Sequence, residues 1–179
     1  MSAVKKVEEF EAVGFFPVKR PDIPPYRMSK PFDWRVDPYD DSKWCFQLQT
    51  LRYLMIYHSA YRETGNEEYF LSLIDWFGDW WSSAKSIPGF YTWHDMATGI
   101  RAEKIHQLAQ EIKASGIKKP VWFDEMIQAH VRVLRKKGFI RLNHNHGLYA
   151  VHGLRCLAEH LGPCMKKTYL VMRTLALRR

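Results

Sequence analysis

The sequence predicts an all-α fold, an array of antiparallel helical hairpins that forms either a solenoid or an incomplete (α/α) toroid. From residue 42 onward, apolar residues recur at a spacing of three and four, which is typical of amphipathic helices. The predicted helix starts follow one another at intervals of about 25 residues, although no strong sequence repeat accompanies this period. Short connections make consecutive helices antiparallel, and no segment has the pattern of a long strand.

Residues 1–40 differ from the rest and are predicted to form an extended proline-rich arm ahead of a helical domain at 41–179. Six of the nine prolines lie in this arm, which argues against a long helix there. The arm is also rich in aromatic residues, so we expect it to pack on the helices. These residues are Phe15, Phe16, Tyr26, Phe32 and Trp34.

The first three predicted helices have a polar start and a stop that contains glycine or proline. The first follows Asp40-Asp41-Ser42, which are good N-cap residues, and runs to about residue 62, where a Thr-Gly-Asn segment ends it. The second covers about 67–84 and ends before Pro88-Gly89. The third begins near Asp95 and ends at Ser115-Gly116.

Three more helices complete the predicted array. The fourth begins around Pro120, because proline is favoured in the first turn of a helix, and continues to Gly138. The fifth runs from about residue 145 to 161 and ends at Gly162-Pro163. The sixth covers about 164–177. An array that stops before closure would expose an apolar face there, around Met165, Tyr169 and Met172, so we expect self-association or marginal stability.

The net charge of +8 is distributed unevenly along the chain. Residues 1–93 carry 11 Lys/Arg and 13 Asp/Glu, whereas residues 94–179 carry 16 and 6. A positive field of this size raises the local concentration of a polyanion. Charge by itself fits both nucleic acid and acidic polysaccharide.

Cysteine spacing and hydropathy indicate the cellular compartment in which we expect the protein. The three cysteines form no C-x-x-C pair and no zinc-finger spacing, so they are interpreted as reduced thiols. No apolar run approaches the roughly 20 residues of a membrane span. The first residues lack the apolar core of a signal peptide. We therefore expect a cytoplasmic protein without a membrane partner.

A polar cluster at the start of the fifth helix is the most informative candidate site. Asn145, His146 and Tyr149 bring an amide, an imidazole and a phenol together where backbone N–H groups can hold an anion. At about 100° per residue, His146 and Tyr149 lie about 60° apart, between the apolar stripe and the solvated face. His146 could also serve only as a local cap or packing residue. We favour the functional interpretation.

A second polar cluster, Trp93-His94-Asp95-Met96-Ala97-Thr98-Gly99-Ile100-Arg101, begins the third helix. Asp95 is well placed to cap this helix. His94 is either oriented by a neighbouring carboxylate or buried. Arg101 either holds a substrate carboxylate in a bidentate contact or is an ordinary surface arginine.

Three segments, in order along residues ~30–162, resemble the N-terminal domain of the heparinase II/III-like polysaccharide lyases. They are Phe32-Asp33-Trp34-Arg35 with Asp37-Pro38-Tyr39-Asp40-Asp41-Ser42-Lys43-Trp44-Cys45-Phe46-Gln47-Leu48, then the cluster that begins at Trp93, and then Asn145-His146-Gly147-Leu148-Tyr149. The resemblance implies an (α/α) toroid followed by a β-sandwich. It also implies β-elimination on a uronic-acid polysaccharide such as heparan sulfate or alginate, by proteins that are often periplasmic or secreted.

The same resemblance implies roles for individual residues. Asn145 and His146 would be the catalytic pair that neutralises the sugar carboxylate and moves the C5 proton. Gln47, His94, Arg101 and Tyr149 would contact the substrate. No cofactor and no metal ion are expected, because the zinc site of some relatives lies in the β-sandwich.

The sequence departs from the family pattern in one respect that bears on activity. Neither Tyr149 nor Tyr169 stands where the family has its catalytic tyrosine, tens of residues after the Asn-His pair. We therefore interpret the chain as the opening half of a lyase toroid, which binds acidic polysaccharide with little turnover.

Two alternatives remain open at this point. The first is a non-catalytic helical module that binds a glycan or a nucleic acid electrostatically, although polysaccharide is preferred to nucleic acid. The second is a metal site built from His94, His144 and His146. The His-x-His spacing supports it only weakly, because alternate residues at a helix start diverge.

Overall fold

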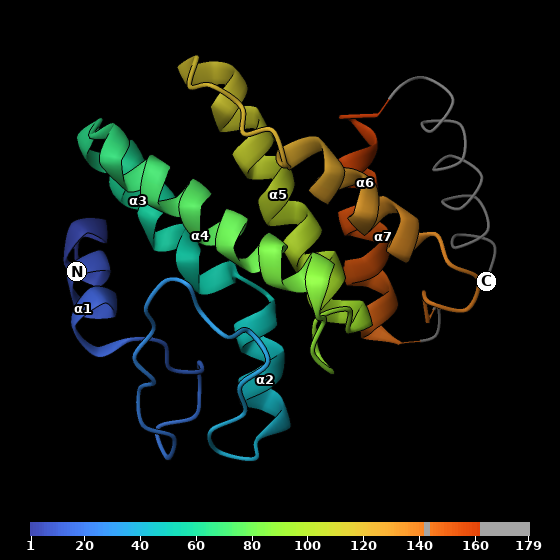
Figure 1. Cartoon of the computed structure of the whole chain (residues 1–179), viewed down its shortest axis with the longest axis horizontal. Coiled ribbons are helices and arrows are strands. Elements are labelled where there is room, and N and C mark those ends of the chain that lie inside the picture. Colours follow the sequence, from blue (N-terminus) through green and yellow to red (C-terminus); the bar gives the residue numbers. More distant parts are fainter. Residues whose placement is uncertain (142–143, 162–179) are drawn as a thin grey trace. The chain divides into compact units, whose positions relative to one another are not determined.

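The computed structural model describes residues 1–141 and 144–161. Over these residues it contains seven α-helices and a short 3₁₀ helix (Figure 1). They contain no β-strand apart from an isolated bridge between Phe15 and Tyr26. The all-α prediction is therefore confirmed. The chain divides into two compact units at residues 1–92 and 93–179, whereas the sequence placed a boundary at residue 40.

The first unit contains four α-helices. In chain order, these are α1 (Ala3–Val13), α2 (Ser42–Gln49), α3 (Met55–Thr64) and α4 (Glu67–Ser86). The two-residue connection between α3 and α4 makes them an antiparallel hairpin, and α1 packs on α3. Contacts from Ala3 to Glu63 and from Glu11 to Tyr57 show that α1 runs antiparallel to α3.

Helix α1 corrects the prediction that residues 1–40 contain no long helix. The first proline is Pro17, so proline restricts only the segment that follows α1. Ser2 caps the helix by accepting a hydrogen bond from the Lys5 amide, and Gly14, which has a positive φ of 95°, ends it. The rest of the arm is irregular and includes the buried side chains of Phe15 and Trp34.

The predicted helix at 42–62 is interrupted in the structure. Asp41 caps α2 as expected, but Leu51 adopts a left-handed conformation with a φ of 54°, and the 3₁₀ helix Arg52–Leu54 follows before α3. A non-glycine residue in this region costs about 1–2 kcal/mol. Complete burial of the Leu51 side chain offsets a cost of this size.

A buried amide joins the arm to the helices of the first unit. The Gln49 Nε2 donates to the Trp34 carbonyl oxygen at 2.6 Å, and the Trp80 Nε1 donates to Gln49 Oε1 at 2.9 Å. All three side chains are buried. Gln49 therefore connects three segments that are distant in the sequence.

Replacing Gln49 with leucine is expected to destabilise the first unit by about 2 kcal/mol. The substitution keeps most of the volume but removes one hydrogen-bond partner from the Trp34 carbonyl and one from the Trp80 indole, and each buried group left without that partner costs about 1–3 kcal/mol. Urea unfolding followed by circular dichroism measures the change. The exposed Gln128 is the matched control, and an equal loss in Gln128→Leu would contradict the assignment.

The second unit contains three helices, α5 (Asp95–Ser115), α6 (Phe123–Leu134) and α7 (Asn145–Ala158). Helices α5 and α7 pack most closely, and their contacts advance in the same direction along both, so they are parallel. The contacts that establish the parallel direction of α5 and α7 pair Asp95 with His146, Gly99 with Tyr149, and His106 with His160. Helix α6 connects α5 to α7 in the sequence and packs on both.

The close approach of α5 and α7 depends on two glycines. A Cβ added at Gly99 would lie 2.4 Å from the backbone carbonyl of Tyr149, and one at Gly153 would lie 2.4 Å from the Gly99 carbonyl oxygen. Only hydrogen fits at these positions. The two glycines hold the first turns of α5 and α7 side by side, and these turns contain the two polar clusters.

The observed helix ends refine the other predictions. Helix α5 begins and ends as expected, α7 ends at Ala158 instead of 161, and α6 begins at Phe123, three residues after Pro120. The predicted sixth helix at 164–177 and its apolar face lie outside the described residues.

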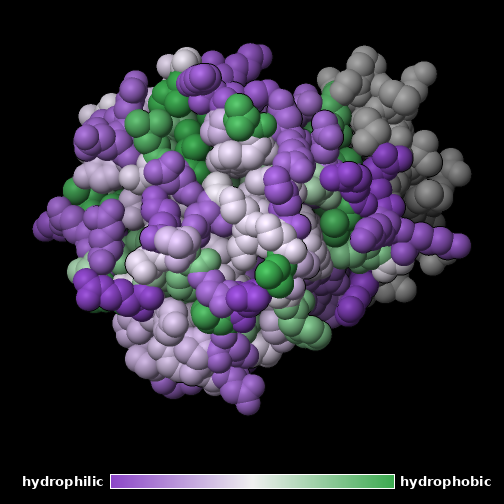
Figure 2. All heavy atoms as spheres, in the orientation of Figure 1, coloured by the Kyte–Doolittle hydropathy of each residue, from purple (hydrophilic) through white to green (hydrophobic). Residues whose placement is uncertain are grey.

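The surface view in Figure 2 shows a mainly hydrophilic face on which hydrophobic side chains are scattered. Over the part of the chain that the structure describes, no helix is both long and apolar enough to cross a membrane.

Candidate functional site

Two histidines and one aspartate converge where α5 and α7 begin. The Nδ1 atom of His146 lies 2.9 Å from Asp95 Oδ1, and the Nδ1 atom of His94 lies 3.3 Å from the same oxygen. The Nε atom of Arg141 lies 3.3 Å from the other oxygen, Oδ2. One carboxylate thus faces two imidazoles and a guanidinium. We call His94, Asp95 and His146 the histidine–aspartate cluster.

Asp95 is buried and held by its own helix. It is the first residue of α5, since His94 is the N-cap, so the capping role predicted for Asp95 is only partly right. Its Oδ1 accepts a hydrogen bond from the Met96 amide at 2.7 Å. Burial raises the pKa of the Asp95 carboxyl. The Met96 amide, His94 and His146 lower this pKa by more than burial raises it, so the net pKa lies below the ordinary value. The carboxylate is therefore ionised at neutral pH.

The two histidines of the cluster differ in what surrounds them. Burial lowers the pKa of His94, the Asp95 charge opposes that change, and His146 and Arg141 lower the pKa further. His94 is therefore neutral at pH 7. His146 Nδ1 is the donor of the hydrogen bond to Asp95, because an ionised carboxylate can only accept.

The neighbours of His146 on α7 are accessible to solvent. His144 is the N-cap, and its Nδ1 accepts from the His146 amide at 3.3 Å, so the capping histidine is His144 and not His146. Asn145 is exposed, and Tyr149 is 41% exposed. The structure brings the rings of His94 and His146 to 5.3 Å between their centres, and Asn145 and Tyr149 lie on the same helix as His146.

Arg101 does not lie at a surface, which corrects both interpretations of it. Its side chain is fully buried, and its Nε donates to His130 Nε2 at 2.9 Å. Its guanidinium also lies 5.5 Å from the centre of the Trp93 ring. Direct contact between Arg101 and a substrate carboxylate is not supported by this position. The residue instead supports the start of α5 from inside.

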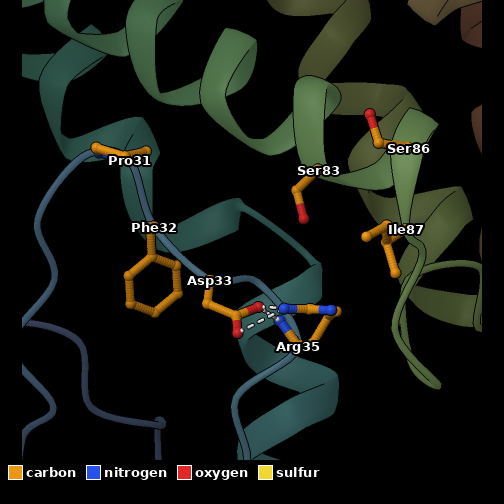
Figure 3. A pocket seen from close by; sticks show the side chains of 7 residues that line it. All are labelled: Pro31, Phe32, Asp33, Arg35, Ser83, Ser86 and Ile87. Carbon is orange, nitrogen blue, oxygen red and sulfur yellow. Dashed lines mark hydrogen bonds and ion pairs between the residues drawn. The ribbon is translucent and has the colours of Figure 1, made fainter.

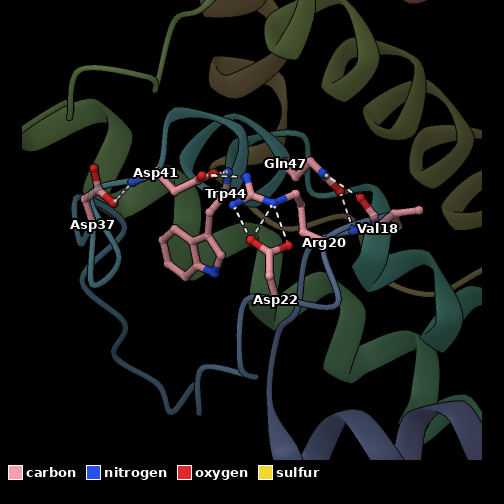
Figure 4. Close-up of polar contacts among 7 residues, drawn as sticks. All are labelled: Val18, Arg20, Asp22, Asp37, Asp41, Trp44 and Gln47. Carbon is pink, nitrogen blue, oxygen red and sulfur yellow. Dashed lines mark hydrogen bonds and ion pairs between the residues drawn. The ribbon is translucent and has the colours of Figure 1, made fainter.

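Gln47 lies in the first unit, and its side-chain amide is used locally. Figure 4 shows this amide directed at the backbone of Val18, from which Oε1 accepts at 2.7 Å and to which Nε2 donates at 3.2 Å. Nearby, Arg20 forms ion pairs with Asp22 and Asp41. The predicted contact of Gln47 with substrate stays a prediction.

Two hollows in the first unit involve none of the predicted site residues. The one in Figure 3 has a volume of about 290 Å³, and its charged lining residues, Asp33 and Arg35, form an ion pair with each other. The other measures about 250 Å³ and includes Phe90, which is 94% exposed.

A comparison with protein families decides where the chain belongs. The profile of the heparinase II/III N-terminus family matches residues 3–154. The chain belongs to this family. Neither the curated proteins nor the solved structures provide a match. The resemblance seen in residues ~30–162 is thus confirmed, and the match extends toward the N-terminus to include α1.

Two charged residues of this heparinase II/III N-terminal domain were not predicted as site residues. Asp95 was assigned to helix capping, and Arg141 was not singled out. The signal for Asp95 was present, because alternate helices of a hairpin array begin at the same end. The third and fifth predicted helices therefore bring His94-Asp95 and His146 to one end. Arg141 lies in an irregular segment, where the sequence pattern gave no signal.

The second unit of this heparinase II/III N-terminal domain also concentrates imidazole groups. Seven of the eight histidines lie between residues 94 and 160, in the half of the chain that carries the excess of Lys and Arg. A positive, histidine-rich surface suits an anionic ligand whose reaction requires proton transfer.

Proposed function

We propose that this chain is the toroid portion of a heparinase II/III-like polysaccharide lyase and that it binds uronic-acid polysaccharide at the start of α7. The observation that carries the proposal is the hydrogen bond between His146 and the buried, ionised Asp95, beside the exposed Asn145. Membership in the family supports the reaction class.

The direction of the helices in the second unit supports an incomplete (α/α) toroid. In such a fold, successive hairpins place their inner helices parallel to one another and their outer helices antiparallel to these. The parallel pair α5 and α7, with α6 connecting them in the sequence, fits one and a half hairpins of that arrangement. The polar clusters at the starts of α5 and α7 then lie at one end of the inner layer.

The cluster fits the demands of β-elimination on a uronic acid. The C5 proton is hardly acidic until the adjacent carboxylate is neutralised, and the Asn145 amide is a donor suited to that carboxylate. Asp95 acts as a positioning residue, because it fixes the His146 ring by accepting from Nδ1, and a neutral imidazole then has its lone pair on Nε2. His146 Nε2 is the proposed acceptor of the C5 proton. His94 and Tyr149 flank the bound sugar.

The direct test combines binding and turnover on defined uronate polymers. We expect the wild-type chain to bind heparan sulfate or alginate and the Asn145→Ala, His146→Ala double variant to bind at least about 10-fold more weakly, since each lost hydrogen bond to a charged group is worth about 1.5–3 kcal/mol. Equilibrium titration measures the affinity. Ultraviolet absorbance of unsaturated sugar ends measures any turnover.

His152→Ala is the matched control for this test. His152 lies on the exposed face of the same helix, so its loss tests the effect of removing one imidazole from α7. Affinity in the double variant equal to that of wild type and the control would remove Asn145 and His146 from the binding site.

Binding is expected to exceed turnover in the isolated chain. No tyrosine of this sequence matches the family position that protonates the leaving oxygen, and losing one proton-transfer partner typically costs about 10²–10⁴-fold in rate. Robust turnover that His146→Ala abolishes would contradict this expectation. Tyr149, one turn after His146, would then be the first candidate for the acid.

The alternative function is a non-catalytic polyanion-binding module, which the 16 basic and 6 acidic residues of 94–179 favour. Such a module would bind heparin, alginate and single-stranded DNA with similar affinity and lose all three steeply as salt rises. A preference for uronate polymers that depends on Asn145 and His146 would favour the lyase instead.

A further inference from the structure

We infer that His94, Asp95 and His146 bind one divalent transition-metal ion, with Zn²⁺ as the best fit. The ligand set differs from the metal site considered from the sequence, because Asp95 takes the place of His144. This inference goes beyond the proposed function, since it concerns metal binding in the absence of any substrate.

The three side chains hold their ligand atoms close together. One nitrogen from each histidine and one carboxylate oxygen all lie within 4.8 Å of one another. Zinc at about 2.0–2.1 Å from each ligand in a tetrahedral arrangement separates its ligand atoms by roughly 3.3 Å. Small side-chain rotations therefore suffice to enclose an ion.

One oxygen of the cluster's carboxylate, Asp95 Oδ2, accepts no hydrogen bond from the described residues, although Oδ1 accepts two. Asp95 is only 7% exposed, and its Oδ2 is buried. The contact that Oδ2 has is the ion pair with Arg141 at 3.3 Å. A buried carboxylate oxygen without a donor is costly, and a metal ion coordinated by Asp95 would compensate for it.

The chemistry of the donors selects the kind of metal. Two imidazole nitrogens and one carboxylate oxygen suit zinc and other late first-row ions, whereas Mg²⁺ and Ca²⁺ prefer oxygen donors throughout. Three protein ligands leave a fourth position for water, as in open zinc sites. His94 and His146 supply the nitrogens, and the Met96 amide holds the carboxylate in place.

The helices that carry the three ligands, α5 and α7, are packed tightly against each other. All three ligands come from the first turns of α5 and α7 or the residue just before them. The contact through Gly99 and Gly153 fixes the separation of these turns. Ligands on packed helices keep their geometry better than ligands on loops.

Arg141 competes with the metal for Asp95. Its side chain is 68% exposed, so it can move into solvent when an ion binds. Removing its charge would eliminate both the competition for Oδ2 and the repulsion of a cation. Arg141→Gln should therefore bind zinc more tightly than wild type, by about 5-fold or more.

The experiment is a calorimetric titration of the chelator-stripped, full chain with Zn²⁺ and with Co²⁺. We expect one ion per chain, and a Co²⁺ visible spectrum typical of tetrahedral nitrogen and oxygen coordination. His94→Ala, Asp95→Asn and His146→Ala should each weaken binding by at least about 100-fold, since even the loss of a residue that only supports a ligand costs about 10–100-fold.

Two controls separate this site from other imidazole pairs. His106 contacts His160 at 2.8 Å, and His152 contacts Cys156 at 3.6 Å, so His106→Ala and His152→Ala should leave the affinity unchanged. Circular dichroism checks that each variant is folded. Absence of zinc binding, loss of binding only in His106→Ala or His152→Ala, or an Arg141→Gln affinity no greater than that of wild type would overturn the proposal.

The test is independent of the proposed function. Failure to bind zinc would leave glycan binding by Asn145 and His146 untouched, and failure to bind glycan would leave the metal titration valid. If both ligands bind, zinc on His146 Nδ1 would leave the proton on Nε2, so the imidazole could donate but not accept a proton. Zinc should then suppress any turnover that depends on His146 as a base.

Discussion

Replacing Gly99 with alanine is expected to destabilise the second unit by about 2 kcal/mol or more. The new Cβ would lie 2.4 Å from the carbonyl carbon and oxygen of Tyr149, and a backbone in the next helix cannot rotate away as a flexible side chain can. Overpacking of this kind typically costs about 1–3 kcal/mol or somewhat more, against which alanine recovers up to about 1 kcal/mol of helix propensity. Gly153→Ala should have a similar effect, because its new Cβ on α7 would lie 2.4 Å from the Gly99 carbonyl oxygen on α5.

The separation of α5 and α7 should also affect the site. Because the two helices would move apart, the hydrogen bond between His146 and Asp95 would lengthen, and binding of zinc and of uronate polymer should weaken together. Urea unfolding followed by circular dichroism gives the stability, and the two titrations give the affinities.

Gly116→Ala is the matched control for the Gly99 prediction. Gly116 ends the same helix with a φ of 75°, and no atom lies within 4 Å of the added Cβ. Alanine there incurs only the left-handed backbone cost of about 1–2 kcal/mol, far from the cluster. If Gly99→Ala were no more destabilising than Gly116→Ala, the tight contact between α5 and α7 would be wrong.

The second unit is expected to lose stability as the pH falls below about 6.5, because His130 is buried as the neutral imidazole. Its Nε2 accepts from the Arg101 guanidinium at 2.9 Å, and its Nδ1, 2.8 Å from the Met126 carbonyl oxygen, donates to it. Burial lowers the pKa of His130 well below 6.5, the charge of Arg101 lowers it further, and the Met126 carbonyl opposes these changes. A proton on Nε2 would face the guanidinium directly.

The direction of the pH dependence follows from whether the folded or the unfolded chain binds the His130 proton at the higher pH. As the pH falls, His130 of the unfolded chain is protonated near 6.5 while His130 of the folded chain stays neutral. The stability is therefore fully present above pH 6.5 and is lost below it, by about 1.4 kcal/mol per pH unit for this one proton. Burial also lowers the pKa of His160, which acts in the same direction.

Urea midpoints at pH 7.5, 6.0 and 5.0 measure this dependence. In His130→Gln the amide can still accept from Arg101 but does not titrate, so we expect a lower stability at pH 7.5 and a flatter pH dependence. His152→Gln removes an exposed imidazole from the same unit and should keep the wild-type slope. An unchanged slope in His130→Gln would show that another group controls the acid sensitivity.

Most of the helices could be read from local patterns. Apolar spacing and end signals located α4 and α5 to within two residues, because the residues that form and end these helices are close in sequence. Helix α1 differs from the prediction for 1–40 because it ends before the first proline, Pro17, and the prolines restrict only the segment after it. The break at Leu51 could not be seen, since burial of its side chain offsets a backbone cost that no local signal announces.

The sequence by itself determined the all-α class, the excess of positive charge in its second half and the placement of Asn145, His146 and Tyr149 on one part of a helix. Only the tertiary structure decided which side chains these residues contact. Asp95 became the partner of His146 because the glycine contact brings α5 and α7 closer than any spacing along the chain can indicate. Arg101 is buried against His130, a residue of another helix that is distant in the sequence. Contacts between separate helices depend on which small residues let them approach, and that is a property of the packed unit.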